Sequence, residues 1–142
     1  KLSSAPTFAL WAAKDPEGAN LDRLQVIKGW VDAQGVTDEK IFDVAFSDDR
    51  KKMADGKVPP VGATVDVASA TYTNTIGAGQ LGAFWQDPDF DPAQEAFYYA
   101  RAIEIPTPRW STYDAMHLQI EAPEPTTLQE RAISSAIWYQ GK

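Results

Sequence analysis

Apolar side chains alternate with polar ones over several short stretches of the chain, and this spacing predicts β-strands. In the clearest stretch, Phe97–Ile105, Tyr98 and Ala100 share one face. Tyr99 and Arg101 share the other face, as expected where side chains repeat every second residue. Similar apolar runs predict further strands at Thr7–Ala13, Leu21–Val31, Lys40–Phe46, Thr64–Tyr72, Leu81–Gln86 and Arg131–Tyr139.

The segments between these runs predict turns and loops. Ala33-Gln34-Gly35 separates the second run from the third and fits a hairpin turn. Ser47–Ala63 is polar and carries proline and glycine, so it predicts a long surface loop. Asp91 followed by Pro92 resembles a helix start, and predicts one short helical turn over Ala93–Ala96.

The order of the runs predicts an all-β fold. A further loop is expected over Pro106–Pro125, with space for a short helical piece near Ala115, and no run has the spacing of a long amphipathic helix. About seven or eight short strands joined by loops of uneven length are typical of an immunoglobulin-like β-sandwich. The 142 residues, 44% of them hydrophobic, suffice for one domain spanning 1–142.

Composition narrows the function classes. The formal charge of −7 argues against nucleic acid and against an anionic membrane surface. No apolar run approaches the ~20 residues of a membrane span. The absence of cysteine excludes disulfides, thiolate catalysis and cysteine-based zinc sites. The chain begins without an initiator methionine or signal-peptide pattern, so we expect it to be a piece of a larger protein.

The sequence holds no complete catalytic or metal-binding constellation. His117 is the single histidine, whereas metal sites built on imidazole use two or three. Asp114 lies three residues before it, but a catalytic triad also needs a nucleophile, and no Gly-x-Ser-x-Gly motif is present. The prediction is therefore no catalytic residue, no metal and no cofactor, and no enzymatic activity for this chain alone.

Three alternating acids, Asp87, Asp89 and Asp91, resemble the start of a calcium-binding loop. The resemblance to an EF-hand then fails, because Pro92 stands where glycine is needed and Tyr98 where glutamate is needed. The favoured interpretation is a turn that caps a helix, with a calcium site of another kind left open.

The tryptophans allow two interpretations. Trp11, Trp85 and Trp138 lie in apolar runs and are expected in the core or in an interface. Trp110 lies in the proline-rich loop and is expected to be exposed. The candidate ligand-binding residues are Arg109, Trp110, Tyr113 and His117.

Three strings resemble a known family: FALWAAKDPEGANLDRLQVIKGWVD, TNTIGAGQLGAFWQDPDFDPAQEAFYYARAIEIPTPRWSTYDA and ERAISSAIWY. Together they resemble the C-terminal end of a large exported bacterial family of unknown function, which is itself similar to PHP-type and amidohydrolase-like metallohydrolases. The resemblance covers nearly the whole chain except Asp49–Pro60. It implies a periplasmic or extracellular location and an upstream catalytic domain that carries the metal ligands. Cysteines that members often carry near the variable loop are absent here.

Three functions follow as hypotheses. The chain is a non-catalytic accessory domain that packs on that upstream catalytic domain and leaves an apolar patch exposed when isolated. Alternatively, it is a carbohydrate- or ligand-binding module, which requires a coplanar row of exposed aromatic rings on one sheet face. Thirdly, Arg109, Asp114 and His117 reach into the active site of the upstream domain.

Overall fold

The computed structural model describes residues 4–141, and most of their regular structure is β-strand. One short helix, α1 (Trp110–Leu118), occurs among these residues. The chain is therefore an all-β protein with a short helix, as the sequence predicts. The strands are β1 (Thr7–Ala13), β2 (Leu21–Val31), β3 (Thr37–Phe46), β4 (Gln80–Gln86), β5 (Ala96–Glu104), β6 (Thr107–Pro108), β7 (Thr127–Leu128), β8 (Arg131–Ile133) and β9 (Ile137–Tyr139).

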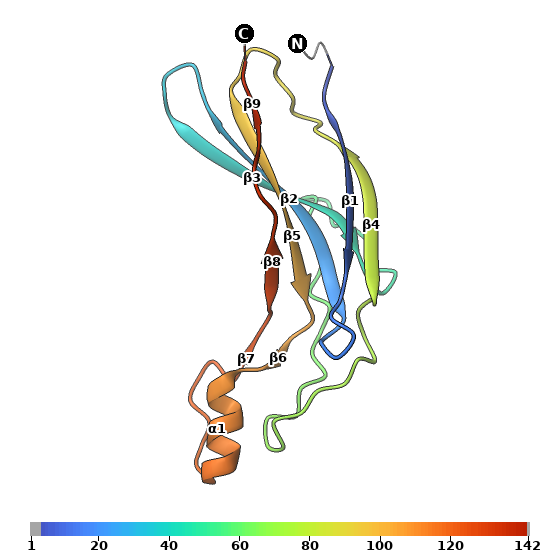
Figure 1. The fold of residues 1–142 in the computed structure, drawn as a ribbon, viewed down its shortest axis with the longest axis vertical. Coiled ribbons are helices and arrows are strands. Elements are labelled where there is room, and N and C mark those ends of the chain that lie inside the picture. The colour runs from blue at the N-terminus through green and yellow to red at the C-terminus, as the bar shows by residue number, and fades with distance from the viewer. Residues whose placement is uncertain (1–3, 142) are drawn as a thin grey trace.

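Two antiparallel sheets form the layers of a sandwich (Figure 1). The larger sheet has the order β3-β2-β5-β8, with β9 also paired to β5, and the smaller sheet contains only β1 and β4. A third pairing, between β6 and β7, forms a short ribbon that carries α1 away from one end of the sandwich. The narrower immunoglobulin-like classification stays a prediction.

The core lies between the two sheets. Its buried centre consists of Val26 from β2 and Ala96 and Tyr98 from β5. Phe8 and Leu10 of β1 pack against this centre from the smaller sheet. Exposed and half-buried residues alternate along β1 and along β4, because every second side chain of a strand points to the same face. The period of two in the sequence therefore sets which side chains hold the layers together.

The β2–β3 hairpin forms as predicted, and its turn is built by one aspartate and one glycine. Oδ1 of Asp32 accepts the backbone N–H groups of Gln34 and Val36. Gly35 has a φ of 80°, a left-handed conformation that glycine adopts without steric cost. The turn chemistry thus fixes the register in which Val31 pairs with Thr37.

The short helical turn predicted over Ala93–Ala96 is wrong. The backbone N–H of Gln94 donates to the carbonyl of Asp91 at 3.2 Å and closes one turn. Ala96 already begins β5, and the carbonyl of Glu95 accepts from Val31 on the neighbouring strand. The chain therefore enters the sheet at the position where a helix would have to continue. The helix of this fold lies instead around Ala115, where the second helical prediction placed it.

Two strand predictions also need correction. Thr64–Tyr72 is not a strand, because Asp66 pairs with Thr71 as an isolated bridge around a turn in which Ala70 has a φ of 49°. The final run, Arg131–Tyr139, is split into β8 and β9. Ser134 causes the break: its hydroxyl accepts the backbone N–H of Ala100 at 2.9 Å, in place of a backbone carbonyl.

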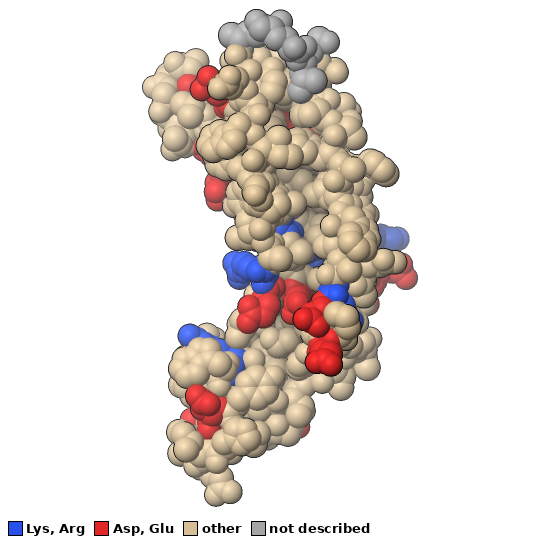
Figure 2. All heavy atoms as spheres, in the orientation of Figure 1, with Lys and Arg blue, Asp and Glu red and all other residues tan. Residues whose placement is uncertain are grey.

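The tryptophans divide between the core and the surface. Trp85 packs against the core, as expected. Trp11 and Trp138 are 71% and 74% exposed, so their assignment to a core is wrong for the isolated chain. Their assignment to an interface stays a prediction. Figure 2 shows that charged side chains concentrate in a band across the middle of the molecule, with largely uncharged surface above it in this view.

Candidate functional site

Helix α1 forms the end of an excursion that leaves the sandwich after β5 and returns at β8 (Figure 1). The β6–β7 ribbon pairs Pro108 with Thr127 at its base. The Thr112 hydroxyl then donates to the carbonyl of Thr126 at 2.6 Å, which ties the first turn of the helix to the returning chain. Gln119, with a φ of 56°, ends the helix in the left-handed conformation typical of helix C-termini.

Three of the four predicted ligand-binding residues share the outward face of α1. Thr112 and Ala115 are buried and define its inner face. Helix positions three, four and seven residues apart lie on one side, so Trp110, Tyr113 and His117 lie together on the opposite side. Trp110 is 66% exposed, which confirms the prediction made for it.

The fourth predicted residue, Arg109, lies apart from this face. It occupies the N-cap position in an extended conformation, is half-buried, and makes no capping hydrogen bond with its side chain. Asp114 does share the outward face with His117, by its position in the helix. The structure thus brings Trp110, Tyr113 and His117 to one surface and leaves Arg109 at its edge.

More apolar residues are exposed on the excursion than the sequence analysis identified. Leu118 is 68% exposed, Ile120 is 62% exposed and Met116 is 37% exposed. The available signal of this exposure was the alternation of apolar with polar residues in Met116-His117-Leu118-Gln119-Ile120, which lies outside the predicted strands. We refer to Trp110, Tyr113, Met116, Leu118 and Ile120 as the helix patch.

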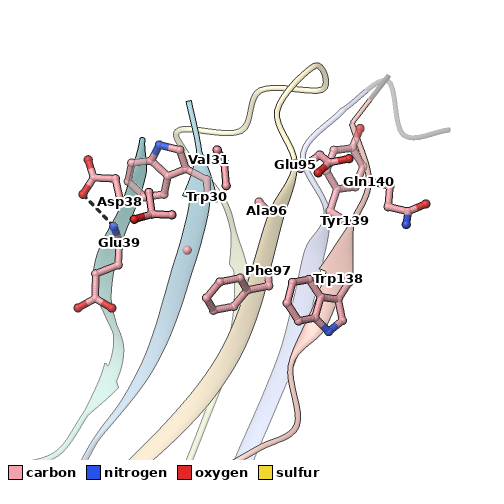
Figure 3. A pocket seen from close by; sticks show the side chains of 12 residues that line it. Trp30, Val31, Asp38, Glu39, Glu95, Ala96, Phe97, Trp138, Tyr139 and Gln140 are labelled. Atoms are coloured by element: carbon pink, nitrogen blue, oxygen red, sulfur yellow. Dashed lines mark hydrogen bonds between the residues drawn. The ribbon is translucent and has the colours of Figure 1, made fainter. Parts of the chain in front are cut away.

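A second candidate site lies on the outer face of the larger sheet, at the end remote from α1. A groove of about 550 Å³ runs over Gly29, with Phe97 and Trp138 on one side and Glu39 on the other (Figure 3). The ring centroids of Phe97 and Trp138 are 5.2 Å apart, and the ring planes make an angle of 48°. Sequence reasoning missed this site, because its residues come from four strands and only register brings them together.

The aromatic residues on this face do not form the coplanar row required of a carbohydrate-binding module. Phe97 and Tyr99 are nearly parallel, with 11° between their planes. Trp138 breaks the plane by its tilt of 48° against Phe97. Trp110, the tryptophan chosen from the sequence for sugar stacking, lies on the helix at the other end of the molecule.

A further groove of about 570 Å³ opens between the layers, along the edge of β1 that pairs with no described strand. Leu24, Val26 and Tyr98 form part of its floor, while Trp11 and Ile137 line its rim. The smaller sheet has two strands and the larger one five, so the inner face of β5, β8 and β9 extends past its cover. The groove is the direct result of this mismatch in width.

Buried charges at the other side of the core hold the β4–β5 loop. Lys28 Nζ and Asp87 Oδ2 are 2.7 Å apart, with 3% and 0% of their side chains exposed. The Tyr98 hydroxyl donates to the same carboxylate oxygen at 2.7 Å. Burial alone favours a higher pKa for Asp87, but the hydrogen bonds from Lys28 and Tyr98 hold its pKa below the usual value. Burial and the neighbouring Asp87 raise the pKa of Tyr98.

The three alternating acids are engaged in contacts with the protein itself. Asp87 is bound by Lys28 and Tyr98, and Asp89 pairs with Lys40. Asp91 accepts the backbone N–H of Ala93 in the predicted turn, but the strand β5 follows in place of a helix that it could cap. Within residues 4–141, no group of three or more His, Cys, Asp or Glu side chains is arranged to hold a metal ion.

The fold and these surfaces define a β-sandwich domain with an exposed apolar excursion. The family model described as "Protein of unknown function (DUF3604)" matches residues 1–141, and the chain belongs to this family. A comparison with curated proteins found no match. A comparison with solved structures found none either. No helix in the described part of the chain is both long enough and apolar enough to cross a membrane.

Proposed function

We propose that this chain is a non-catalytic accessory domain that docks on a neighbouring folded domain of its parent protein through the helix patch. The observation that carries the proposal is the exposure of Trp110, Leu118 and Ile120, at 66%, 68% and 62%, on an excursion that stands away from the sandwich. Large apolar side chains left exposed on one segment mark candidate interaction sites in soluble proteins.

The construction of the excursion supports docking over enzymatic work. Thr112 and the β6–β7 ribbon fix the helix to the sandwich, while the bulky apolar side chains face away from it. Tryptophan and tyrosine are enriched in the centres of interfaces, because they bury a large area with few rotatable bonds. A helix that presents both, with Leu118 exposed at its C-terminal end, is suited to fill a pocket on a partner surface.

The resemblance of the sequence supports an upstream metal-dependent hydrolase of PHP-like or amidohydrolase-like type as the partner domain, in an exported protein. His117 and Asp114 then lie on the face that meets this domain. A contribution of Arg109, Asp114 or His117 to its active site is part of the same hypothesis. The His117→Ala substitution tests that contribution, because an exposed side chain can be removed without loss of the fold.

Hydrogen exchange tests the docking. We expect amides of Trp110–Ile120 to exchange at least about tenfold more slowly in the longer parent protein than in the isolated 142-residue chain, because docking suppresses local opening. The double substitution Trp110→Ser and Leu118→Ser is expected to abolish the difference. The control is Met53→Ser, which changes another exposed apolar residue, 49% exposed, on the Ser47–Ala63 loop.

Two results contradict the proposal. One is equal exchange of α1 in the parent protein and in the isolated chain. The other is reproducible turnover of ester or phosphoester substrates by the isolated chain with zinc or manganese, which would make it an enzyme in its own right. Metal-dependent hydrolysis by the parent protein alone agrees with the proposal.

A further inference from the structure

A straight row of four residues crosses the outer face of the larger sheet. Glu39 on β3 is paired with Gly29 on β2, and Gly29 is paired in turn with Phe97 on β5. Phe97 is paired with Trp138 on β9. Residues directly opposite one another across an antiparallel ladder project to the same face. The row therefore places one carboxylate, one position without a side chain, and two aromatic rings side by side (Figure 3).

Gly29 determines how the Phe97 ring lies. A Cβ atom at position 29 would stand 2.3 Å from Cζ of Phe97, so the ring covers the glycine and lies low against the sheet. One face of the ring is consequently turned toward solvent, and Phe97 is half-buried. Trp138, 74% exposed, rises beside it at 48°. Together the two rings form two walls of an open aromatic corner.

The groove above this corner is acidic. Glu39 and Glu95 line it, and none of the described residues that line it is a lysine or an arginine. Asp38 also touches the groove, but it pairs with Trp30 and projects to the opposite face from Glu39. The lysines of the same strands are engaged on the inner face, where Lys28 pairs with Asp87 and Lys40 with Asp89. The carboxylates of the groove are therefore not neutralised by the basic side chains nearest to them in sequence.

We propose that this groove binds a small organic cation, an ammonium or guanidinium group carried on an apolar skeleton. The cation lies over the open face of Phe97, with Trp138 as the side wall and the carboxylate of Glu39 across from them. An aromatic face attracts a cation within about 6 Å of its centroid, and a carboxylate adds a charge-assisted hydrogen bond. The volume of about 550 Å³ lies within the range of small-ligand sites.

This site is separate from the proposed docking surface. The groove includes residues of β9 and of the turn before β5, at the end of the molecule opposite α1 (Figure 1). Loss of docking through α1 leaves the groove intact, so the two proposals fail independently.

The test is a titration of the ¹⁵N-labelled 142-residue chain with 2-phenylethylammonium chloride, followed by the indole N–H resonances of the tryptophans. Its uncharged analogue 2-phenylethanol is the parallel probe. We expect a saturable shift of the Trp138 resonance with the ammonium probe and binding about tenfold weaker with the alcohol. Raising the salt concentration should weaken binding of the ammonium probe and leave binding of the alcohol unchanged.

Matched variants locate the binding. Glu39→Gln keeps the shape of the groove and removes its central charge, and Trp138→Phe removes the observed resonance while retaining a ring. We expect Glu39→Gln and Trp138→Ala each to weaken binding at least about fivefold. For Trp138→Ala the shifted backbone amide of Phe97 is the readout. The control is Trp11→Ala, which removes a tryptophan of nearly equal exposure, 71% against 74%, from the other sheet.

The proposal is overturned if the alcohol binds as tightly as the ammonium probe, or if Trp138→Ala and Trp11→Ala have the same effect. It is also overturned if neither probe shifts any indole resonance at about 20 times the protein concentration or more, up to about 10 millimolar. A dissociation constant above that concentration is weak even for a fragment-sized ligand. Shifts of Trp138 by methyl β-glucoside, with none by the ammonium probe, would assign the groove to a sugar instead.

Discussion

Two irregular segments leave the sandwich of this protein, and they differ in which side chains they bury and which they expose. The Ser47–Ala63 loop is polar and leaves most of its charges in solvent, but it turns Arg50 and Val58 inward, where Arg50 lies 2.6 Å from Asp22 and the backbone N–H of Val58 donates to Asp43. The excursion around α1 directs apolar side chains outward and is attached by few polar contacts. A segment fixed by buried charges serves its own domain, whereas one that exposes apolar groups is suited to a partner.

The loop is held by charges that water hardly reaches. Arg23 Nη1 and Asp43 Oδ2 are 3.1 Å apart, with 12% and 7% of their side chains exposed. The same arginine donates to the carbonyl groups of Val58 and Pro59. Arg50 approaches Oδ1 of Asp22 as an ion pair, although this oxygen accepts no hydrogen bond with good geometry. The loop is thus held at its base by buried arginine–aspartate contacts. The excursion is held by its ribbon, by the Thr112 hydroxyl and by the Gln129 amide, which donates to Asp22 and to the carbonyl of Glu104.

The largest expected effect on stability comes from a substitution that removes a buried contact at the base of the loop. Asp43→Ala removes the acceptor of the Gln25 amide and one of the two carboxylates that pair with Arg23, which keeps its pair with Asp22. Removal of one partner from a buried pair costs about 3–5 kcal/mol, and the remaining pair places the cost at the lower end of that range. We expect that loss in the free energy of unfolding, measured by urea denaturation. Asp89→Ala, which breaks the exposed Lys40 pair, should cost less than about 1 kcal/mol. Equal losses in the two variants would contradict the distinction between buried and exposed pairs.

The excursion side of the comparison is tested by its anchor. Thr112→Val preserves the shape of the side chain and removes the hydrogen bond to Thr126, so we expect local opening of α1 to become easier by about 1–2 kcal/mol. Native-state hydrogen exchange of residues 110–118 measures this, and global stability should change less. The matched control is Ser111→Ala: the Ser111 hydroxyl is buried with no partner among the described residues, so its removal should cost nothing. A loss at Ser111 as large as at Thr112 would show that the anchor is misassigned.

Much of the sandwich was predictable, because strand periodicity is a local property. The bounds of the first two strands were predicted correctly, and Gly35 indicated the hairpin. Thr64–Tyr72 misled because β-branched residues also occur in turns, and local propensity does not distinguish the two. The break at Ser134 was likewise invisible, since it depends on a hydroxyl that replaces a carbonyl across the sheet.

The candidate sites were predictable to different degrees. The exposure of Trp110 followed from a proline-rich context that no core could cover. The groove over Gly29 could not be foreseen, because Glu39, Phe97 and Trp138 meet only through the registers of three strand pairs. Register depends on the whole sheet, and a shift of one residue moves every side chain to the opposite face. Sequence reasoning therefore found the site made by one segment and missed the site made by several.

The junction between the sandwich and the excursion, at the end of β5, is tested by the pH dependence of stability. Burial, followed by the charges of Glu130 and Asp15, raises the pKa of Glu104 above its ordinary value of 4.5. A carboxyl with a raised pKa in the folded state favours folding below the unfolded pKa, and this contribution is lost as pH rises through the folded pKa. Asp87, whose pKa is lowered, has the opposite sign: its contribution is present above its unfolded pKa of 3.8 and is lost as pH falls through the folded pKa.

Glu104→Gln should therefore stabilise the protein at pH 7, by less than about 1 kcal/mol because the group is partly solvated. The gain should disappear when unfolding is measured below pH 4.5, the ordinary pKa of a glutamate side chain. Glu130→Gln, which removes the charge with the largest effect on this pKa, should give part of the same gain. A destabilisation by Glu104→Gln at pH 7 would show that its carboxylate makes favourable contacts at the base of the excursion.

The smallest effect on stability is expected from the side chains with the largest role in docking. Trp110→Ser combined with Leu118→Ser changes two residues that are 66% and 68% exposed, and substitutions at exposed positions usually change the free energy of unfolding by less than about 0.5 kcal/mol. Urea denaturation of the isolated chain measures this, while analytical ultracentrifugation should show less self-association at high concentration, because the apolar surface is smaller. A loss of stability comparable to that of Thr112→Val would mean that the helix patch packs on its own domain. The contrast between a loop held by buried polar contacts and an excursion that exposes apolar side chains would then disappear.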